Sequence, residues 1–337
     1  MDVDRYDPLR CPNCRGLLAF EAASARLACT GCGAGVPVVG GVPRFAGEAY
    51  AASFGRQWNR YDVARAGEDE ATFRVKTGLD PRALAGRLVL DAGCGGGRYA
   101  ALLGRLGARV VGVDLSAAVE KAAAACAGMP GVLIAQADLL DLPLAEACFD
   151  VVFSIGVLHH SPEPRRAFAR VAARVKPGGR LAVWLYRRNT PPQEWLNSAL
   201  RALTTRLPAR VLEPLCVGLG GLGGVPVLNR ALNKVANFSN HPDWTLRVCD
   251  NFDWYAPTHQ SHHSVAELLS WFAAEGFDDL TVLPPARAGR LYDWAYRRGL
   301  VIGSGVNVAG TRRCAAGTGG GSEGLETARV EADVTRP

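Results

Sequence analysis

Residues 88–186 alternate short apolar runs with helical segments, and this alternation constrains the fold more than any other feature of the chain. Strands that alternate with helices form parallel sheets, because each helix carries the chain back across one face of the sheet. The sequence therefore predicts an α/β fold with helices on both faces of the sheet. The expected strands are Leu88–Leu90, Val110–Val113, Val132–Ala135, Val151–Ile155 and Leu181–Leu185, and the expected helices are Arg98–Leu106, Ser116–Cys126 and Glu163–Val175. Ser116 is expected to cap the second helix, and residues 176–179 are expected to form a turn.

The rest of the chain divides into segments around this core. Residues 1–45 form a compact cysteine-containing unit, and the segment after residue 250 resumes with a helix and two strands, Ser264–Ala274, Leu280–Leu283 and a strand within Gly305–Gly310. The predicted organisation is a cysteine unit at 1–45, a helical linker at 46–80, a core at 81–189, inserted helices at 190–250, the remainder of the core at 251–314 and a disordered tail at 315–337.

Composition excludes several classes of protein. The chain has 337 residues, of which 48% are hydrophobic and 21% charged, so it is neither mostly disordered nor collagen-like. Its formal charge of +6 is modest for this length, and no DNA partner is expected. We find neither an export signal nor a convincing transmembrane segment, which predicts a cytoplasmic protein with reduced cysteines. The sequence leaves the oligomeric state open.

The segment Asp91-Ala-Gly93-Cys-Gly95-Gly-Gly97-Arg98 follows the first core strand and opens a helix. Glycines in such a turn let the backbone approach a ligand closely. A dinucleotide site is not favoured, because Arg98 stands where its fingerprint requires a small residue. Asp91, Asp114 and Asp138 each end one of three successive strands, so all three carboxyl groups are expected at one edge of the sheet. There they would form a pocket for a cationic nucleoside.

Five segments in order resemble a class I S-adenosylmethionine (SAM)-dependent methyltransferase: LDAGCGGGRYA, VVGVD, AQADLLDLP, FDVVFSIGVLHH and VKPGGRLAVWLY. The resemblance implies a Rossmann-like seven-stranded sheet with one antiparallel strand in its last hairpin. It further implies roles for individual residues in holding SAM. Gly93, Gly95 and Gly97 would flank its methionyl part, and Asp91 would help to hold its amino group. Asp114 would hold the ribose, and Asp138 with Leu139 the adenine. Leu115 would also bind the cofactor, and Val157 would face it.

His159 and His160 follow the fourth strand, where the active-site mouth of such a fold opens. Imidazole ordinarily titrates near neutral pH, so either histidine suits a general base for methyl transfer. A structural or gating role is the alternative for both.

A second polar and aromatic cluster lies between Asp250 and His263. We expect it to be a loop that lines the acceptor pocket through Trp254, Tyr255, His259 and His263. A loop anchored by its aromatic residues and a histidine metal site are the alternatives. In the linker, Trp58 and Tyr61 would either close over the cofactor or pack against the domain.

Cys11-x-x-Cys14 and Cys29-x-x-Cys32 stand 14 residues apart. This spacing in a reduced chain is typical of a tetrahedral, structural Zn²⁺ site, with disulfides as the alternative. The unit resembles the zinc ribbons that precede some methyltransferase domains. As a separate unit, it would lose its fold on metal removal while cofactor binding remained largely intact.

The function predicted from these features is SAM-dependent methylation of a small-molecule acceptor, either a specialised metabolite or a lipid-linked intermediate, with the 190–250 helices as a lid. The alternative is an RNA or protein methyltransferase that docks through the zinc ribbon. RNA is not excluded because six arginines gather near the C-terminus: Arg287, Arg290, Arg297, Arg298, Arg312 and Arg313. A SAM-binding protein without turnover is a third hypothesis.

Overall fold

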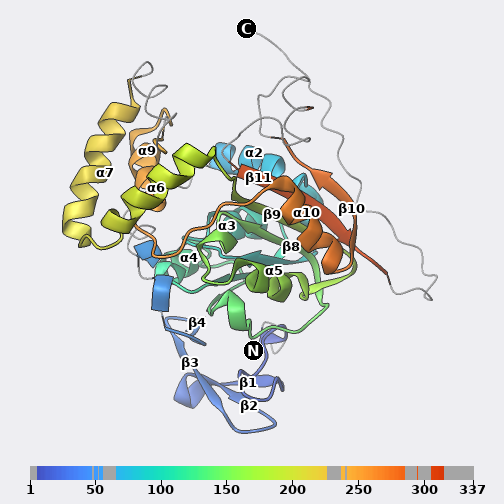
Figure 1. Ribbon diagram of the computed structural model, residues 1–337. Helices are drawn as coiled ribbons and strands as arrows, with labels where there is room; N and C mark the ends of the chain where they lie inside the picture. The colour runs from blue at the N-terminus through green and yellow to red at the C-terminus, as the bar shows by residue number, and fades with distance from the viewer. Residues whose placement is uncertain are drawn as a thin grey trace.

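The computed structural model describes residues 6–47, 49–51, 53–55, 66–225, 237–239, 241–284, 294 and 305–314. Its centre is a seven-stranded sheet in the order β10-β11-β9-β8-β5-β6-β7 (Figure 1). The strands are β5 (Leu88–Ala92), β6 (Arg109–Asp114), β7 (Val132–Gln136), β8 (Phe149–Ile155), β9 (Val175–Tyr186), β10 (Phe277–Val282) and β11 (Gly305–Arg312). β11 runs antiparallel to both of its neighbours, and the other described pairs are parallel. The expected sheet, with one antiparallel strand in its last hairpin, is confirmed.

Adjacent residues on the central strands point into two different hydrophobic clusters. Leu90 and Val111 face one cluster, whereas Val89 and Val110 face the other. Successive side chains of a strand alternate between faces, so a strand that is apolar throughout must be covered on both sides. The covering helices are α2 (Ala66–Thr77), α3 (Arg98–Arg105) and α4 (Ala118–Ala125) on one face, and α5 (Pro164–Ala172) and α10 (Val265–Ala274) on the other.

Two local predictions about the core were wrong. Ser116 does not cap α4, whose N-cap is Ala117. The Ser116 hydroxyl, one residue before the cap position, donates to the Asp114 carboxylate at 2.7 Å and accepts from the Ala118 amide at 3.3 Å. The segment 176–179 is not a separate turn, since it lies inside β9. Gly178, at φ +74°, lets the strand continue through an irregular pairing with β8.

The inserted helices form a lobe beside the sheet (Figure 1). They are α6 (Pro191–Thr204), α7 (Ala209–Gly223) and α9 (Trp244–Tyr255). The expected loop around residues 250–255 is therefore helical, and α9 runs across the predicted boundary at residue 250. The lobe has its own apolar cluster, built from α7 and α9, with Leu212, Cys216, Val248, Phe252 and Tyr255. Among the helices the structure describes, none is both long and apolar enough to cross a membrane.

The N-terminal unit is a small antiparallel sheet in the order β1-β2-β3-β4. Its strands are β1 (Leu18–Glu21), β2 (Arg26–Cys29), β3 (Gly35–Val39) and β4 (Val42–Pro43). Short 3-10 turns complete the described elements: η2 (Ala22–Ser24), η3 (Ala49–Ala51), η4 (Pro81–Leu84), η5 (Leu139–Asp141) and η6 (Leu158–His160). Figure 1 shows this unit beneath the α/β core.

Candidate active site

A pocket opens at the carboxyl ends of β5, β6 and β8, where parallel sheets of this kind bind ligands. It measures about 1100 Å³ including its open mouth. Its lining comes from the glycine turn, three strand ends, η6, the linker and helix α9. The residues are Ala51, Phe54, Asp91, Gly93, Cys94, Gly95, Gly96, Arg98, Tyr99, Asp114, Leu115, Lys121, Leu139, Ile155, Gly156, Val157, Leu158, His160, Ser161 and Asp253.

Asp91 places a buried carboxyl group at the pocket wall. The residue is 2% exposed, and its Oδ2 atom has no hydrogen-bond partner. Burial, reinforced by the neighbouring Asp114, raises the pKa of Asp91 to about 8. A buried carboxyl oxygen without a partner is costly unless a ligand supplies the missing donor. The site therefore fits a ligand with a cationic amino group, the feature that SAM carries.

The glycine turn brings the backbone close to other elements. Gly93 has φ +93°, and a Cβ atom built there would lie 2.3 Å from a methyl carbon of Val157. Gly97 has φ +80°, and its Cβ would lie 2.7 Å from the Cα of Ala122 on α4. Gly93 and Gly95 line the pocket directly, whereas Gly97 packs α3 against α4. Any side chain at Gly93 or Gly97 would both strain the backbone and displace a neighbour.

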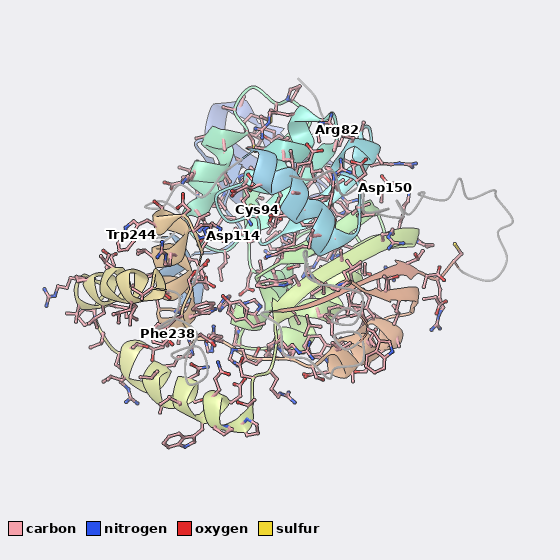
Figure 2. The ribbon with its side chains drawn as sticks, turned by 90° about the horizontal axis from the view of Figure 1, so that it is seen from above. Arg82, Cys94, Asp114, Asp150, Phe238 and Trp244 are labelled. Carbon is pink, nitrogen blue, oxygen red and sulfur yellow. The ribbon has the colours of Figure 1, made fainter. Side chains whose placement is uncertain are left out.

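Asp114 is oriented by three hydrogen bonds. Its Oδ2 accepts from the Gly95 amide at 2.9 Å, and its Oδ1 accepts from the Ser116 amide and hydroxyl. Burial raises the pKa of this carboxyl group as well. A carboxylate has about four lone-pair positions, so Asp114 keeps capacity for a ligand hydroxyl. Figure 2 shows Asp114 and Cys94 on the side of the sheet toward helix α9.

The remaining predicted cofactor residues separate into two groups. Leu115, Leu139 and Val157 line the pocket. Asp138 does not line it, and its Oδ1 instead accepts from the Leu140 amide at 2.9 Å, capping η5. The carboxyl group predicted to hold adenine therefore shapes the turn that carries Leu139.

The two histidines of η6 occupy different environments. His160 lines the pocket, and its Nδ1 lies 3.1 Å from the carbonyl oxygen of His259. A carbonyl only accepts, so Nδ1 carries the hydrogen and Nε2 of the neutral ring holds the lone pair. His159 is fully buried and stacks on Tyr186, with the two ring centres 3.9 Å apart. Burial, with the neighbouring His160, lowers the pKa of His159 well below its ordinary value, so this ring stays neutral.

Asp253 is one of the pocket residues that the sequence analysis did not single out. It projects from α9, and its Oδ2 lies 3.6 Å from His160 Nε2. The Tyr186 hydroxyl donates to the same oxygen. Phe54 completes this side, with its ring centre 4.8 Å from that of His160. A carboxylate facing the lone-pair nitrogen of a histidine stabilises a proton that arrives there.

The four residues predicted to contact an acceptor lie outside the pocket lining. The Tyr255 hydroxyl donates to the Asn237 carbonyl at 2.9 Å, and Trp254 packs on the apolar cluster of the lobe. His259 contributes its backbone carbonyl to His160. His263 contacts Ser261 and Glu267 at 2.8 and 3.0 Å, beside the capping box of α10. None of these four side chains lines the pocket, and the described histidines form no metal-binding group.

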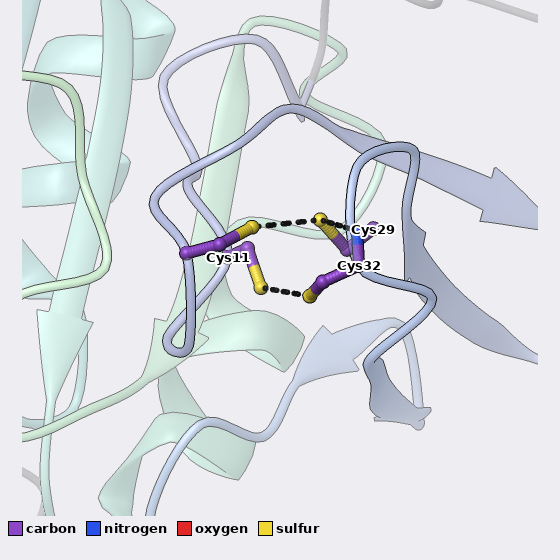
Figure 3. A group of neighbouring side chains, drawn as sticks. Cys11, Cys29 and Cys32 are labelled. Carbon is purple, nitrogen blue, oxygen red and sulfur yellow. Dashed lines mark hydrogen bonds between the residues drawn. The ribbon is translucent and has the colours of Figure 1, made fainter.

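The four cysteines of the N-terminal unit come together as predicted (Figure 3). Their Sγ atoms all lie within 4.8 Å of one another, with Cys14 to Cys29 at 3.4 Å and Cys11 to Cys32 at 3.6 Å. All four are free thiols. A tetrahedral ion with Zn–S bonds of about 2.3 Å would hold its sulfurs about 3.8 Å apart. The donor set therefore fits Zn²⁺.

Several predictions lie outside the described residues. They concern Trp58 and Tyr61, Arg287, Arg290, Arg297 and Arg298, and the tail 315–337. Arg312 and Arg313 are described, and both have intramolecular partners. Arg312 donates to the carbonyls of Ala172, Ala173 and Val175, and Arg313 pairs with Asp278 at 2.9 Å.

Residues 90–183 match the family model of a methyltransferase domain. The chain is 32% identical over 150 residues to a ubiquinone biosynthesis O-methyltransferase of Nitrosococcus oceani, covering 44% of this chain and 63% of that protein. It is 38% identical over 122 residues to the protein of the same name from Alkalilimnicola ehrlichii, covering 35% and 49%. The chain thus spans about half to three-fifths of the length of these relatives.

Among solved structures, a SAM-dependent methyltransferase from Mesorhizobium loti overlaps 68% of this chain and 93% of its own, with 21% identity and a TM-score of 0.42. An overlap this loose does not bear on function. The assignment rests on the family model, which matches the segment that carries the glycine turn, Asp91, Asp114 and His160. Residues 90–183 are thus a methyltransferase domain, and a four-cysteine unit precedes it.

Proposed function

We propose that this protein is a SAM-dependent methyltransferase that methylates a hydroxyl oxygen of a small-molecule acceptor. The observation that carries the proposal is the pocket itself. One side offers the Asp91 carboxyl group, whose Oδ2 atom has no hydrogen-bond partner, and the Asp114 carboxylate, and the other side offers the His160–Asp253 pair. The relatives are named as O-methyltransferases, which supports an oxygen acceptor.

SAM supplies the electrophilic methyl group when it is bound. Asp91 would hold its amino group, Asp114 and Leu115 its ribose, and Leu139 and Val157 would contact its apolar surfaces. The glycine turn admits the ligand without a clash, and the apolar wall excludes water. Positioning of the two reactants then supplies much of the catalysis.

His160 and Asp253 would accept the proton that the acceptor hydroxyl loses. His160 Nδ1 is tied to the His259 carbonyl, so a proton can arrive only at Nε2. Asp253 lies 3.6 Å away and stabilises the resulting imidazolium. Tyr186 holds Asp253 in place through its hydroxyl. In this scheme His159 is structural, and general-base catalysis belongs to His160.

The contacts of the described arginines of the N-terminal unit favour a small-molecule acceptor over RNA. Arg15 pairs with Asp141, Arg26 with Glu21 and Arg44 with Glu120. Arg10 donates to the carbonyls of Asp7 and Leu9. Basic groups with intramolecular partners offer little to a phosphate backbone. We propose a structural role for this unit, with Zn²⁺ held by Cys11, Cys14, Cys29 and Cys32.

SAM binding, transfer of a labelled methyl group and a site variant test the proposed function. Calorimetry should detect SAM binding by the purified protein, and methyl-labelled SAM should transfer its label to hydroxylated small molecules in an extract. His160→Gln should lower kcat by about 10²- to 10⁴-fold, the usual contribution of a general base, while SAM affinity stays unchanged. His262→Gln is the matched control, because His262 pairs with Glu194 and does not line the pocket. Label in a nuclease-sensitive fraction would contradict the proposal.

A further inference from the structure

The N-terminal unit is built into the methyltransferase core. Leu9 forms an antiparallel bridge with Leu144, flanked by backbone hydrogen bonds from Arg10 to Pro143 and from Ala145 to Pro8, both at 2.8 Å. Leu9, Leu27 and Val36 belong to the same hydrophobic cluster as one face of the central sheet. Two sets of contacts continue from this junction toward the pocket.

The first set starts at a cysteine knuckle. Arg15 directly follows Cys14 and adopts a positive φ of 60°. Its guanidinium donates to the Leu142 carbonyl at 2.9 Å and pairs with the Asp141 carboxylate. Asp141 ends η5, and Leu139 at the start of that turn lines the pocket. The position of this wall therefore depends on a residue adjacent to a predicted metal ligand.

The second set starts just after β4. Arg44 donates to the side-chain oxygen of Gln136 at 3.0 Å, and the Phe45 amide donates to the Gln136 carbonyl at 2.8 Å. The buried Gln136 amide nitrogen in turn donates to the Leu115 carbonyl at 2.9 Å. Leu115 lines the pocket and directly follows Asp114.

Gln136 is thus oriented from both ends. The amide can donate to Leu115 only when its oxygen faces Arg44, since oxygen and nitrogen occupy opposite positions of the planar group. Arg44 also forms an ion pair with Glu120 on α4, with 3.3 Å between Arg44 Nη2 and Glu120 Oε1. Glu120 directly precedes Lys121, which lines the pocket. Removing Arg44 would leave a buried acceptor without a donor and free the amide to turn.

We propose that Arg15, Arg44 and Gln136 are positioning residues through which the metal-held unit sets the Leu115 and Leu139 walls of the SAM pocket. The inference rests on the proposed function, because it assumes that this pocket binds SAM. Loss of the metal would then weaken SAM binding although no cysteine touches the pocket.

The test uses the full chain with its metal and measures SAM affinity by calorimetry. Arg44→Ala and Gln136→Glu should each weaken SAM binding by about tenfold, the value of one well-placed hydrogen bond. Gln136→Glu is the sharper variant, because it keeps the acceptor for Arg44 but loses the donor to Leu115. Arg44→Lys should restore part of the affinity. Arg26→Ala is the matched control, since its exposed ion pair with Glu21 lies within the unit.

A purely structural role would lower thermal stability without changing the affinity for SAM. The proposal instead requires that KM for SAM rises in Arg44→Ala and Gln136→Glu while kcat at saturating SAM is kept. In a double-mutant cycle, the two changes should be strongly non-additive because they break one chain of contacts.

Metal removal extends the test. Chelation should weaken SAM binding at least about tenfold while far-ultraviolet circular dichroism retains the core signal, and added Zn²⁺ should restore binding. If chelation unfolds the whole chain, the SAM affinities of the metal-containing Arg44→Ala and Gln136→Glu variants decide whether the inference holds. Unchanged SAM affinity in Arg44→Ala and Gln136→Glu would overturn the inference and leave the proposed function intact. If the unaltered protein does not bind SAM, that result would instead contradict the proposed function itself.

Discussion

The two sides of the pocket are constructed differently. The side with Asp91, Asp114 and Leu139 consists of strand ends and the turns that follow them, so the hydrogen bonds of one sheet determine its geometry. The opposite side brings together Phe54, His160 and Asp253 from the linker, η6 and α9. Helix α9 packs within a lobe that has its own apolar cluster. One side is therefore as rigid as the sheet, whereas the other depends on how the lobe docks.

This difference implies that the two sides can be disturbed independently. Among the described residues, Asp253 of the lobe contacts the core through the Tyr186 hydroxyl and lies 3.6 Å from His160 Nε2. Changes on the sheet side should alter SAM binding, and changes on α9 should alter turnover. The predictions below test that separation.

The largest effect is expected from Asp91→Asn on the sheet side. A neutral amide cannot pair with a cationic amino group, and breaking a buried charge pair costs about 3 kcal/mol, roughly a hundredfold in SAM affinity. The raised pKa of Asp91 means that the ligand-free folded protein binds an extra proton between pH 4 and 8, so its stability falls as pH rises through this range. At pH 8 the variant should therefore melt above the unaltered protein without ligand, as calorimetry would show. A lower melting temperature together with intact SAM binding would refute the role of Asp91.

The next effect concerns α9. Asp253→Asn should lower kcat by about tenfold to a hundredfold, the value of a hydrogen bond to a charged group, because His160 would lose the carboxylate that stabilises its proton. SAM affinity should stay within about twofold, since the sheet side is unchanged. Steady-state kinetics with saturating SAM, compared with calorimetry on the same protein, separates the two quantities. If SAM affinity falls as far as kcat, the two sides are not independent.

On the sheet side, the positions of several pocket residues could be predicted from the sequence. Asp91, the glycines and Asp114 lie within short segments whose order in the chain dictates their order at the sheet edge. Asp253 could not be placed in this way, because its contacts with His160 and Tyr186 arise from the docking of inserted helices. A signal was present nonetheless: the apolar residues Val248, Phe252 and Tyr255 recur at helical spacing and are buried together. The contacts between the cysteine unit and the core could not be predicted from the sequence either, since Arg15 and Arg44 contact residues that are far away in sequence.

The pH dependence of SAM binding gives a smaller, graded effect. With a pKa of about 8, Asp91 of the ligand-free protein must lose a proton before it pairs with an amino group. SAM affinity should therefore rise with pH between 6 and 8, by about tenfold for each unit. Calorimetry in buffers of different ionisation enthalpy would also detect the released proton. Asp91→Asn should abolish the slope, and Asp253→Asn should retain it.

The smallest effect is expected from Tyr255→Phe in the lobe. The change removes only the hydrogen bond to the Asn237 carbonyl, which should destabilise the lobe by about 1 kcal/mol. Since Tyr255 does not line the pocket, turnover and SAM affinity should stay within about twofold of the unaltered protein. Activity assays and thermal melts of Tyr255→Phe and Asp253→Asn in parallel would compare two residues of one helix that face opposite ways. Tyr255→Phe could instead lose as much turnover as Asp253→Asn. That result would show that α9 turns its aromatic face to the acceptor and that the pocket closes differently during turnover.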